Sequence, residues 1–176
     1  MDTLTIKRLD YSKYEGKKYE AIIVSDRYLS IEPDGDRFSI EWKTLSEPMT
    51  KVLTDDMLSE WLEEPVSYGA FAGEQLVGFV EGFLEKWNNR YRLTNICVFD
   101  NEARNSGVGS QLLDAIMVDA VNSKARMVVL ETQSYNYKAI SFYKKNGFEI
   151  IGFDRFAYSN NDPLEHNMRI EMGKVL

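Results

Sequence analysis

The stretch Ala103-Arg104-Asn105-Ser106-Gly107-Val108-Gly109-Ser110 decides the fold, because it joins a strand-like run to a helix-like run. The run before it spans Tyr91 to Phe99, and the run after it extends from about Gly109 to Val121. A helix that begins at a glycine turn gathers unpaired N–H groups and positive partial charge, which suits phosphate oxygens. Gly107 and Gly109 carry no Cβ, so backbone can approach a ligand there. We therefore predict an anion site in this loop.

The glycine spacing narrows the kind of phosphate loop. A dinucleotide-binding loop needs a third glycine where this chain has Leu112, and a P-loop needs a Gly-Lys-Ser/Thr ending that is missing here. The remaining pattern is Arg-x-x-Gly-x-Gly, from Arg104 to Gly109. By itself this pattern also fits an ordinary helix start with Arg104 as a solvated loop residue, so both interpretations stay open at this point.

Composition predicts one globular domain over residues 1–176. The chain is 44% hydrophobic and 28% charged, and its length is enough to bury a core. A net charge of −7 argues against a nucleic-acid partner and weakly favours a cationic substrate, although solubility alone explains such a charge. The single cysteine, Cys97, excludes an intrachain disulfide and makes a metal cluster unexpected. No signal peptide or membrane-spanning run is visible, so we expect a cytoplasmic protein with no membrane partner.

Alternation and turn signals predict a mixed α/β sheet in which strands precede and enclose two main helices. Extended segments are expected at residues 4–9, 19–31, 38–42, 67–72, 75–85, 90–99, 126–130, 148–158 and 167–172, and residues 19–31 fit a helix as the alternative. Helices are expected at residues 55–62, from about 109 to 121, and at 137–146, with loops at 10–18, 46–54 and 159–164. The turn Asp34-Gly35-Asp36 predicts a hairpin over residues 28–45. The central helix presents an apolar stripe of Leu112, Leu113, Ile116, Met117, Ala120 and Val121.

A second motif, from Asn136 to Phe148, indicates which anion the glycine loop would bind. Asn136 is expected to cap the helix that follows it, and Gly147 to end that helix. The segment Asn136 to Phe148 matches the pattern Asn-x-x-Ala-x-x-x-Tyr-x-x-x-Gly-Phe at every defined position, and so resembles the GNAT N-acetyltransferases. The resemblance covers about residues 68–158. It implies the GNAT fold, a mixed and mostly antiparallel central sheet flanked by helices, with acetyl-CoA as the cofactor.

A more specific resemblance is carried by Tyr68-Gly69-Ala70-Phe71, Leu130-Glu131-Thr132-Gln133 and Gly152-Phe153-Asp154-Arg155-Phe156-Ala157-Tyr158. These segments are similar to the streptothricin acetyltransferases, which inactivate the antibiotic by acetylating an amine of its β-lysine arm. The resemblance implies direct transfer in a ternary complex and a small cationic amine as acceptor. It implies that Glu131 and Asp154 bind the cation, with Tyr68, Phe156 and Tyr158 as walls.

The family resemblance also assigns residues to the cofactor. It implies an oxyanion-binding backbone N–H near Val98, within Cys97, Val98 and Phe99. The pyrophosphate would lie against Arg104, Asn105, Ser106, Gly107, Val108, Gly109 and Ser110, and Asn136 would reach the pantetheine arm. Tyr143 occupies the position of the acid that protonates the coenzyme A sulfur, and a core aromatic is the alternative. Cys97 itself is expected to be a small core residue.

At one position this sequence differs from the residue that many members of the GNAT family carry. Where many GNAT enzymes carry a glutamate on the fourth strand, this chain has Asn95, and an amide cannot accept a proton. The nearest carboxylate is Glu81 on the preceding strand. A two-residue loop at Asn88 and Asn89 would put Glu81 on the opposite face from Asn95, and a three-residue loop would put both on one face. Glu81 is thus a base or substrate-binding candidate, with a solvated strand position or proton loss through water as alternatives.

Three functions remain open on the sequence. The first is an antibiotic-modifying acetyltransferase. The second is an acetyltransferase for another small amine, a polyamine or a protein N-terminus. This alternative stays open because Asn95 stands where close-looking streptothricin acetyltransferases carry a glutamate. The third is a module that binds acetyl-CoA without turnover. The presence of Tyr143 speaks against this module, because a protein that only binds acetyl-CoA does not need an acid to protonate the sulfur. A homodimer is compatible with all three.

Overall fold

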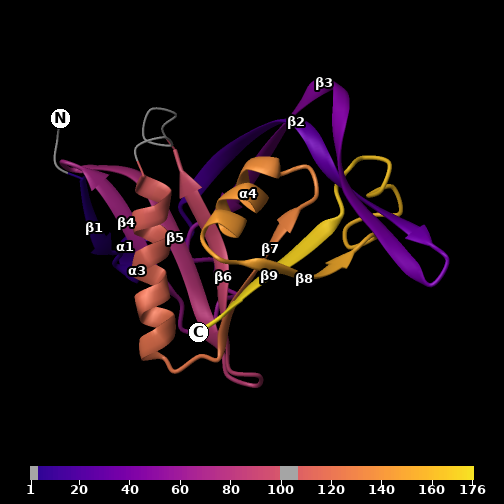
Figure 1. Cartoon of the computed structure of the whole chain (residues 1–176). Coiled ribbons are helices and arrows are strands. Elements are labelled where there is room, and N and C mark those ends of the chain that lie inside the picture. Colours follow the sequence, from indigo (N-terminus) through magenta and orange to yellow (C-terminus); the bar gives the residue numbers. More distant parts are fainter. Residues whose placement is uncertain (1–3, 100–106) are drawn as a thin grey trace. The chain divides into compact units, whose positions relative to one another are not determined.

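The computed structural model describes residues 4–99 and 107–176, which form two compact units. The described part of unit 1 consists of residues 4–21, 53–99, 107–129 and 175–176, and unit 2 of residues 22–52 and 130–174. In unit 1 the strand order is β1 (Leu4–Arg8), β4 (Val66–Ala72), β5 (Gln75–Glu85) and β6 (Arg90–Val98), followed by the start of β7 (Met127–Gln133). The first three pairs are antiparallel and β6 pairs with β7 in parallel, so the sheet is mixed and mostly antiparallel, as predicted (Figure 1).

Helix α3 (Val108–Asn122) packs on β4, β5 and β6. It buries Val108, Leu112, Leu113, Ile116 and Ala120. The predicted apolar stripe is therefore confirmed except at its end, because Val121 is exposed. Val121 follows Ala120 by about 100° around the helix, which turns its side chain away from the sheet. Among the described helices, none is both long and apolar enough to cross a membrane.

The other face of the unit 1 sheet is covered by segments from the first third of the chain. Helix α1 (Tyr11–Tyr14) is capped by Asp10, whose side chain accepts a hydrogen bond from the Ser12 N–H, so the loop predicted for residues 10–18 contains a short helix. A core cluster on this face comprises Leu9, Tyr14, Met57, Leu58, Phe79 and Cys97. The sequence prediction of Cys97 as a small core residue is confirmed.

The segment before β4 differs most from the sequence prediction. Strand β3 (Arg37–Asp56) continues through residues 46–54, which were expected to be irregular, and no helix forms over residues 55–62. The reason is tertiary: Met57 exchanges backbone hydrogen bonds with Gly16 and Lys17, and both Met57 and Leu58 are buried in the core cluster. Those contacts outweigh the local preference of an acidic first turn for a helix.

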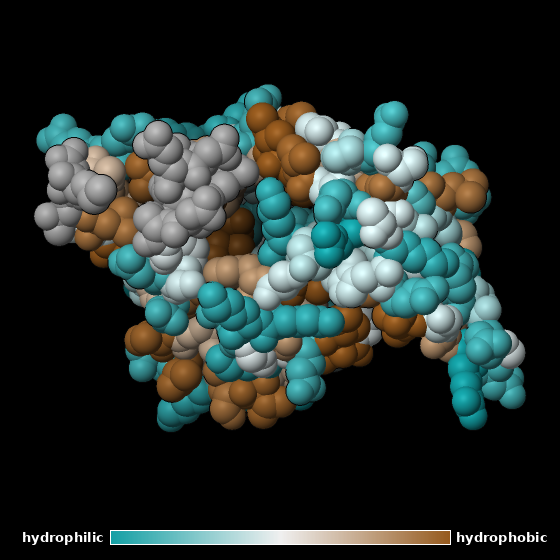
Figure 2. Space-filling view, turned by 45° about the horizontal axis from the view of Figure 1, so that its top comes forward, coloured by the Kyte–Doolittle hydropathy of each residue, from teal (hydrophilic) through white to brown (hydrophobic). Residues whose placement is uncertain are grey.

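Unit 2 contains a long two-stranded ribbon and a short sheet. Strands β2 (Lys18–Asp34) and β3 form the ribbon, which confirms the hairpin at the Asp34-Gly35-Asp36 turn and extends it well beyond residues 28–45. The ribbon carries exposed hydrophobic side chains at Ile22, Val24, Phe38, Ile40 and Val52. Hydrophobic residues also lie among hydrophilic ones on the face of the molecule that Figure 2 displays.

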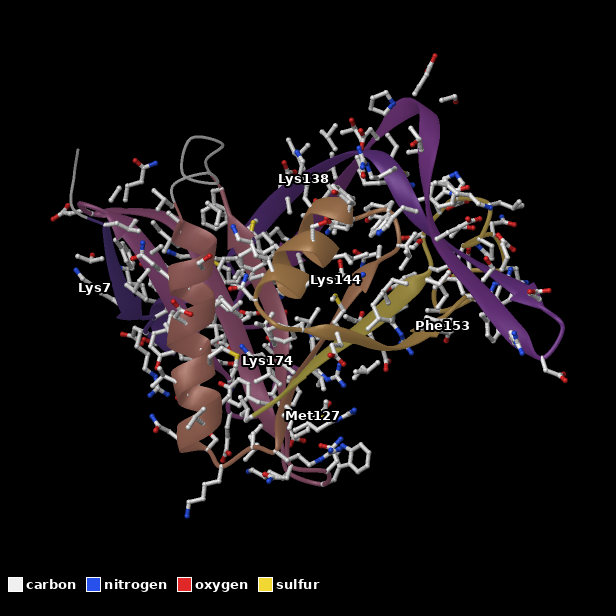
Figure 3. The ribbon with its side chains drawn as sticks, viewed as in Figure 1. Lys7, Met127, Lys138, Lys144, Phe153 and Lys174 are labelled. Carbon is white, nitrogen blue, oxygen red and sulfur yellow. The ribbon has the colours of Figure 1, made fainter. Side chains whose placement is uncertain are left out.

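The short sheet of unit 2 continues β7 with β9 (Arg169–Val175) and β8 (Glu149–Asp154). Strand β8 ends earlier than the predicted 148–158, because the side chain of Asp154 accepts a hydrogen bond from the Phe156 N–H and turns the backbone. Helix α4 (Tyr137–Lys145) begins at Asn136, as predicted. At its other end Lys174 of β9 donates from Nζ to the Asn146 carbonyl at 2.9 Å (Figure 3).

Candidate active site

Glu81 lies in the middle of β5, directly opposite Asn95 of β6. The loop between these strands places Glu85 opposite Arg90, and continuing that register would put Glu81 opposite Thr94. A β-bulge shifts the register between Glu81 and Gly82, so that Thr94 is the extra residue and Asn95 comes to face Glu81. The prediction that a two- or three-residue loop decides which face Asn95 shares with Glu81 was therefore wrong. The loop has four residues, and this loop and the bulge together place Asn95 opposite Glu81.

The Glu81 side chain is enclosed, with 0% of its surface exposed, so the alternative of a solvated strand position is also wrong. Its Oε2 accepts a hydrogen bond of 2.8 Å from the Leu58 N–H, and its Oε1 accepts one of 2.7 Å from Asn95 Nδ2. The Thr94 hydroxyl donates a longer bond of 3.3 Å to Oε1. Burial raises the pKa of Glu81, and these donors act in the opposite direction by favouring the carboxylate.

Asn95 links this carboxylate to a tyrosine that the sequence analysis missed. The hydroxyl of Tyr19 donates a 2.7 Å hydrogen bond to Asn95 Oδ1. The Tyr19 ring is held edge-on against Phe79, with centroids 4.9 Å apart, and lies 6.4 Å from the ring of Phe99. Burial raises the pKa of Tyr19, so its hydroxyl keeps its proton at physiological pH. Because 76 positions separate Tyr19 from Asn95, no local sequence pattern signals the pair.

A cavity of about 420 Å³ lies beside Tyr19. Its lining combines aromatic and apolar side chains with three charged ones: Tyr14, Lys17, Lys18, Tyr19, Glu20, Met57, Leu76 and Phe99. Phe99 follows directly after β6, and its N–H donates to the Val77 carbonyl at 2.9 Å. The Glu81–Asn95–Tyr19 chain thus ends at a hollow lined by a residue that the sequence analysis assigned to the cofactor.

The two faces of the unit 1 sheet separate the other predicted residues. Cys97 pairs with Phe79 and belongs to the core cluster on the Glu81 face. Val98 lies opposite Gly78, where an added Cβ would contact Leu112 of α3, so the Val98 side chain is on the α3 face. Tyr68 pairs with Val80, one position out of step with Glu81, and therefore also lies on the α3 face. Tyr68 and Glu81 are not brought together.

The start of α3 has the form expected of an anion site. Gly107 adopts a left-handed conformation with φ of 84°, and among the described residues none beyond its chain neighbours lies within 4 Å of where its Cβ would be. The first turn of α3 contains no acidic residue. The N–H groups of Val108, Gly109 and Ser110 occupy the first turn, where a helix offers them no internal partner. Arg104, Asn105 and Ser106 lie outside the described residues. The described part of the loop thus fits a phosphate group.

In unit 2, α4 carries both predicted residues of the second motif. The Asn136 side chain accepts a 3.3 Å hydrogen bond from the Ala139 N–H, which occupies its amide oxygen in the helix cap. Tyr143 is buried, and its ring lies edge-on to Phe142 and Phe148 with centroids 5.4 Å and 5.7 Å apart. Burial raises the pKa of Tyr143, so the group stays protonated and able to donate.

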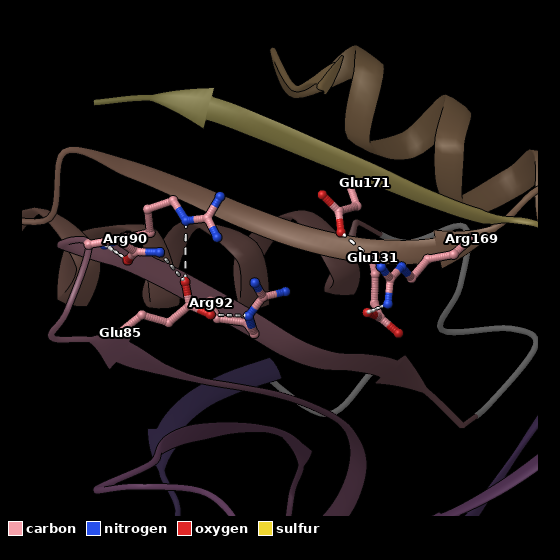
Figure 4. Close-up of polar contacts among 7 residues, drawn as sticks. Glu85, Arg90, Arg92, Glu131, Arg169 and Glu171 are labelled. Carbon is pink, nitrogen blue, oxygen red and sulfur yellow. Dashed lines mark hydrogen bonds and ion pairs between the residues drawn. The ribbon is translucent and has the colours of Figure 1, made fainter. Parts of the chain in front are cut away.

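The acidic residues predicted to bind a cation surround an arginine in unit 2. Arg169 of β9 lies 4.0 Å from Glu131 and 3.5 Å from Glu171 (Figure 4). It also lies 3.9 Å from Asp154. Three carboxylates around one guanidinium leave the group with net negative charge. Arg169 was not predicted as a site residue, because its alternation with the buried Ile170 indicates a strand and not a function.

The predicted aromatic walls are also in unit 2. Phe156 and Tyr158 are exposed, and the Tyr158 hydroxyl lies 3.4 Å from Gln133 Nε2 and 3.5 Å from Glu131 Oε1. The backbone N–H of Tyr158 donates to Asp162 at 2.7 Å, which anchors the loop that follows β8. Glu131, Asp154, Arg169 and Tyr158 thus form one polar surface, which we call the Arg169 cluster.

Comparisons with known proteins agree with this architecture. The model of the acetyltransferase (GNAT) family matches residues 36–148. A streptothricin acetyltransferase from Escherichia coli is 30% identical over 121 residues, which cover 69% of this chain and 67% of that protein.

Among solved structures, a nourseothricin acetyltransferase superposes with a TM-score of 0.81 at 22% identity and covers 98% of both chains. A candidate streptothricin acetyltransferase from Bacillus anthracis str. Ames, in complex with acetyl coenzyme A, gives a TM-score of 0.75 at 22% identity, over 99% of this chain and 98% of that one. These structures confirm the predicted fold. A family model that spans well over half of the sequence and a relative at 30% identity lead to the same conclusion, and the chain belongs to the GNAT family of acetyl-CoA-dependent N-acetyltransferases.

Proposed function

We propose that this enzyme acetylates a primary amine of streptothricin, on its β-lysine arm, and so inactivates the antibiotic. The observation that carries the proposal is the 30% identity to a streptothricin acetyltransferase over 121 residues. The net charge of −7 and the Arg169 cluster support a cationic acceptor, because Glu131 and Asp154 provide negative charge on one surface.

Acetyl-CoA supplies the acetyl group as a thioester, and the start of α3 is suited to its pyrophosphate. The N–H groups of Val108, Gly109 and Ser110 point out of the helix end, and the helix dipole adds partial positive charge. Gly107 lets the backbone turn at φ of 84° without steric conflict. Arg104 would add a guanidinium to the same phosphate oxygens.

Two groups of the chain are proposed for the chemistry of transfer. The backbone N–H of Val98 would donate to the carbonyl oxygen as negative charge develops on it. The Tyr143 hydroxyl, kept protonated by burial, would give its proton to the leaving sulfur. The acceptor ammonium loses two protons in all and the sulfur gains one, so each transfer releases one proton to water, and the other proton replaces the one that Tyr143 gives up. Alignment of amine and thioester is the main contribution of the protein.

Glu81 does not fit the role of direct base. Its carboxylate has no exposed surface and already accepts hydrogen bonds from Leu58, Asn95 and Thr94. The ammonium of the acceptor therefore loses its proton to water rather than to Glu81 in this proposal.

The test is thiol release from acetyl-CoA by the purified protein with streptothricin, compared with spermidine and with a peptide that has a free N-terminus. Rapid release with streptothricin and a protective effect on bacteria that express the chain are expected. Release only with spermidine or the peptide would replace the proposal by acetylation of that amine. Binding of acetyl-CoA without release for any amine would identify a module without turnover.

A further inference from the structure

We propose that Tyr19 contacts the acceptor amine, with its hydroxyl oxygen accepting a hydrogen bond from the reacting N–H, and that Asn95 and Glu81 are positioning residues for this hydroxyl. The inference rests on amine acetylation by this enzyme and adds a substrate-contacting residue to it. Tyr19 comes from β2, in a part of the chain for which the sequence motifs predict no function.

The position of the Tyr19 ring is fixed on two sides. Phe79 holds it edge-on at 4.9 Å, and Phe99 lies at 6.4 Å on the cavity side. The side chain is nonetheless half-buried rather than enclosed, and it lines the 420 Å³ cavity. The Tyr19 side chain is therefore held in a fixed position and lines the cavity, whereas the Glu81 carboxylate, which it reaches through Asn95, has no exposed surface.

The direction of each hydrogen bond follows from Glu81. An ionised carboxylate only accepts, so Asn95 must turn its NH₂ group toward Glu81 Oε1 and its Oδ1 toward Tyr19. Tyr19 then commits its only proton to Asn95, at 2.7 Å. The hydroxyl oxygen of Tyr19 then keeps a lone pair that can accept a hydrogen bond, and in this proposal the N–H of the amine donates it.

Protonation of Glu81 reverses this chain. A protonated carboxyl donates to Asn95 Oδ1, the Asn95 NH₂ group then donates to the Tyr19 oxygen, and the Tyr19 proton turns toward the cavity. A Tyr19 proton that points into the cavity would face the N–H of the amine, and two donors cannot form a hydrogen bond with each other. The surrounding charges bear on the pH at which this occurs: Asp55 of β3 raises the pKa of both Glu81 and Tyr19, Cys97 of β6 faces Tyr19, and the cavity adds Lys17, Lys18 and Glu20.

No proton is transferred through the chain. Tyr19 keeps its proton because burial raises its pKa, and Asn95 has none to exchange at physiological pH. As the nitrogen attacks, its bond to the carbonyl carbon forms and the carbon–sulfur bond breaks. The displaced N–H proton passes to water. Tyr19 contributes orientation of the lone pair of the nitrogen, and the positioning residues contribute the orientation of Tyr19.

The first experiment replaces Tyr19 with phenylalanine. Loss of one oriented hydrogen bond is expected to lower kcat/KM for the acceptor by about 10-fold while KM for acetyl-CoA and the melting temperature stay near those of the parent. The matched control is Tyr11→Phe, which removes a hydroxyl that donates at 2.8 Å to Glu15 on an exposed surface and belongs to a residue that does not line the cavity. An unchanged kcat/KM in Tyr19→Phe, or an equal loss in Tyr11→Phe, overturns the proposal.

The second experiment tests the coupling to Glu81. Glutamine at this position accepts from Leu58 and donates to Asn95, which imitates the protonated state, so Glu81→Gln is expected to lower kcat/KM about 10-fold and to remove the acidic limb of its pH profile. In the Tyr19→Phe background the same change should have little further effect, because Glu81 acts through the hydroxyl. Effects that multiply in the double variant would show that Glu81 acts independently of Tyr19.

The acceptor for both experiments is whichever amine gives the fastest thiol release. Failure of streptothricin as a substrate would overturn the proposed function and leave the role of Tyr19 measurable with spermidine or a peptide. Normal turnover of streptothricin by Tyr19→Phe would overturn the inference and leave the proposed function intact. The two failures are therefore distinct.

Discussion

Asn95 donates a 2.7 Å hydrogen bond to Glu81 across the β5–β6 ladder, and the two residues face each other because a bulge inserts Thr94 between them and the hairpin end. Without the bulge, Glu81 would lie opposite Thr94 and Asn95 would point to the α3 face. One extra residue in a strand thus determines whether the carboxylate and the amide meet. Since Asn95 also binds Tyr19, the bulge determines the orientation of three side chains.

Gly82 is the residue on β5 beside this bulge, and Gly82→Ala should disrupt it. A Cβ at position 82 would lie 2.5 Å from the Arg92 carbonyl oxygen and 2.8 Å from the Tyr91 ring. We expect a loss of about 2–3 kcal/mol in the free energy of unfolding, measured with urea, together with a loss of turnover. The control is Gly152→Ala, whose Cβ would meet only the flexible end of Glu171 at 3.4 Å. Equal stability of the two variants would contradict the steric role of Gly82.

Tyr143→Phe should slow acetyl transfer and leave acetyl-CoA binding in place. The ring packs on Phe142 and Phe148, contacts that phenylalanine keeps, and only the proton donor is lost. We expect kcat to fall by about 100-fold, the usual range for a general acid. The measurement is steady-state thiol release alongside calorimetric binding of acetyl-CoA. Tyr137→Phe on the same helix serves as control, and undiminished kcat in Tyr143→Phe would remove this residue as the acid.

The acidic residues of the Arg169 cluster should determine affinity for a cationic acceptor. In Asp154→Asn the amide oxygen can still accept from the Phe156 N–H, so the turn survives while one negative charge is removed. We expect KM for streptothricin to rise by about 5-fold at low ionic strength for Asp154→Asn and for Glu131→Gln, and the effect to shrink as salt is added. Glu149→Gln, at an exposed position of β8, is the control. If the control raises KM as much, the effect is one of net charge alone.

Glu85 should contribute to stability in a pH-dependent way. Its side chain is 11% exposed and forms ion pairs with Arg90 and Arg92 (Figure 4). Burial opposes ionisation, but hydrogen bonds from Arg92 and Asn88 outweigh it, so the pKa of Glu85 lies below its ordinary value. A depressed pKa stabilises the fold above the unfolded-state pKa of about 4.3, and this contribution is lost as the pH falls through the folded-state pKa.

Glu85→Gln is therefore expected to cost about 1–2 kcal/mol of unfolding free energy at pH 7, and less at pH 3. Urea unfolding at both pH values measures the difference. Glu74→Gln, in the exposed turn between β4 and β5, controls for the change in net charge. A cost at pH 3 as large as at pH 7 would show that the carboxylate charge is not what stabilises this pair of strands.

The elements that the sequence predicted best are those whose signals are local. Asn136 caps α4, and the strands predicted at residues 67–72, 75–85 and 90–99 match β4, β5 and β6 to within one residue at each end, because caps and strand patterns depend on neighbouring residues. The segment around Met57 was predicted as a helix and is not one, since its conformation depends on contacts with Gly16 and Lys17 some forty positions away.

In the candidate site, too, residues with local sequence signals were predicted and contacts between distant residues were not. Asn95 was identified from the family pattern and Glu81 as the nearest carboxylate. Whether they face each other depends on a bulge, and a strand glycine such as Gly82 does not by itself fix where a bulge falls. Tyr19 was missed because its partner is distant in the chain and tyrosines are common in strands. Arg169 was missed because a charged residue that alternates with buried ones is typical of any strand with one solvated face.

The enclosure of Glu81 has a consequence for which nitrogen of an acceptor reacts. A carboxylate with no exposed surface does not take a proton from a bound ammonium, and in our proposal that proton passes to water, so the pKa of each amine decides how readily it becomes neutral. At a given pH the neutral fraction of a basic amine falls about tenfold for each unit by which its pKa rises. An acceptor that carries several amino groups is then acetylated first at the least basic of them. Under our proposal, chemoselectivity of this kind follows from the pKa values of the acceptor's own amines, because Glu81 does not act as a base on them.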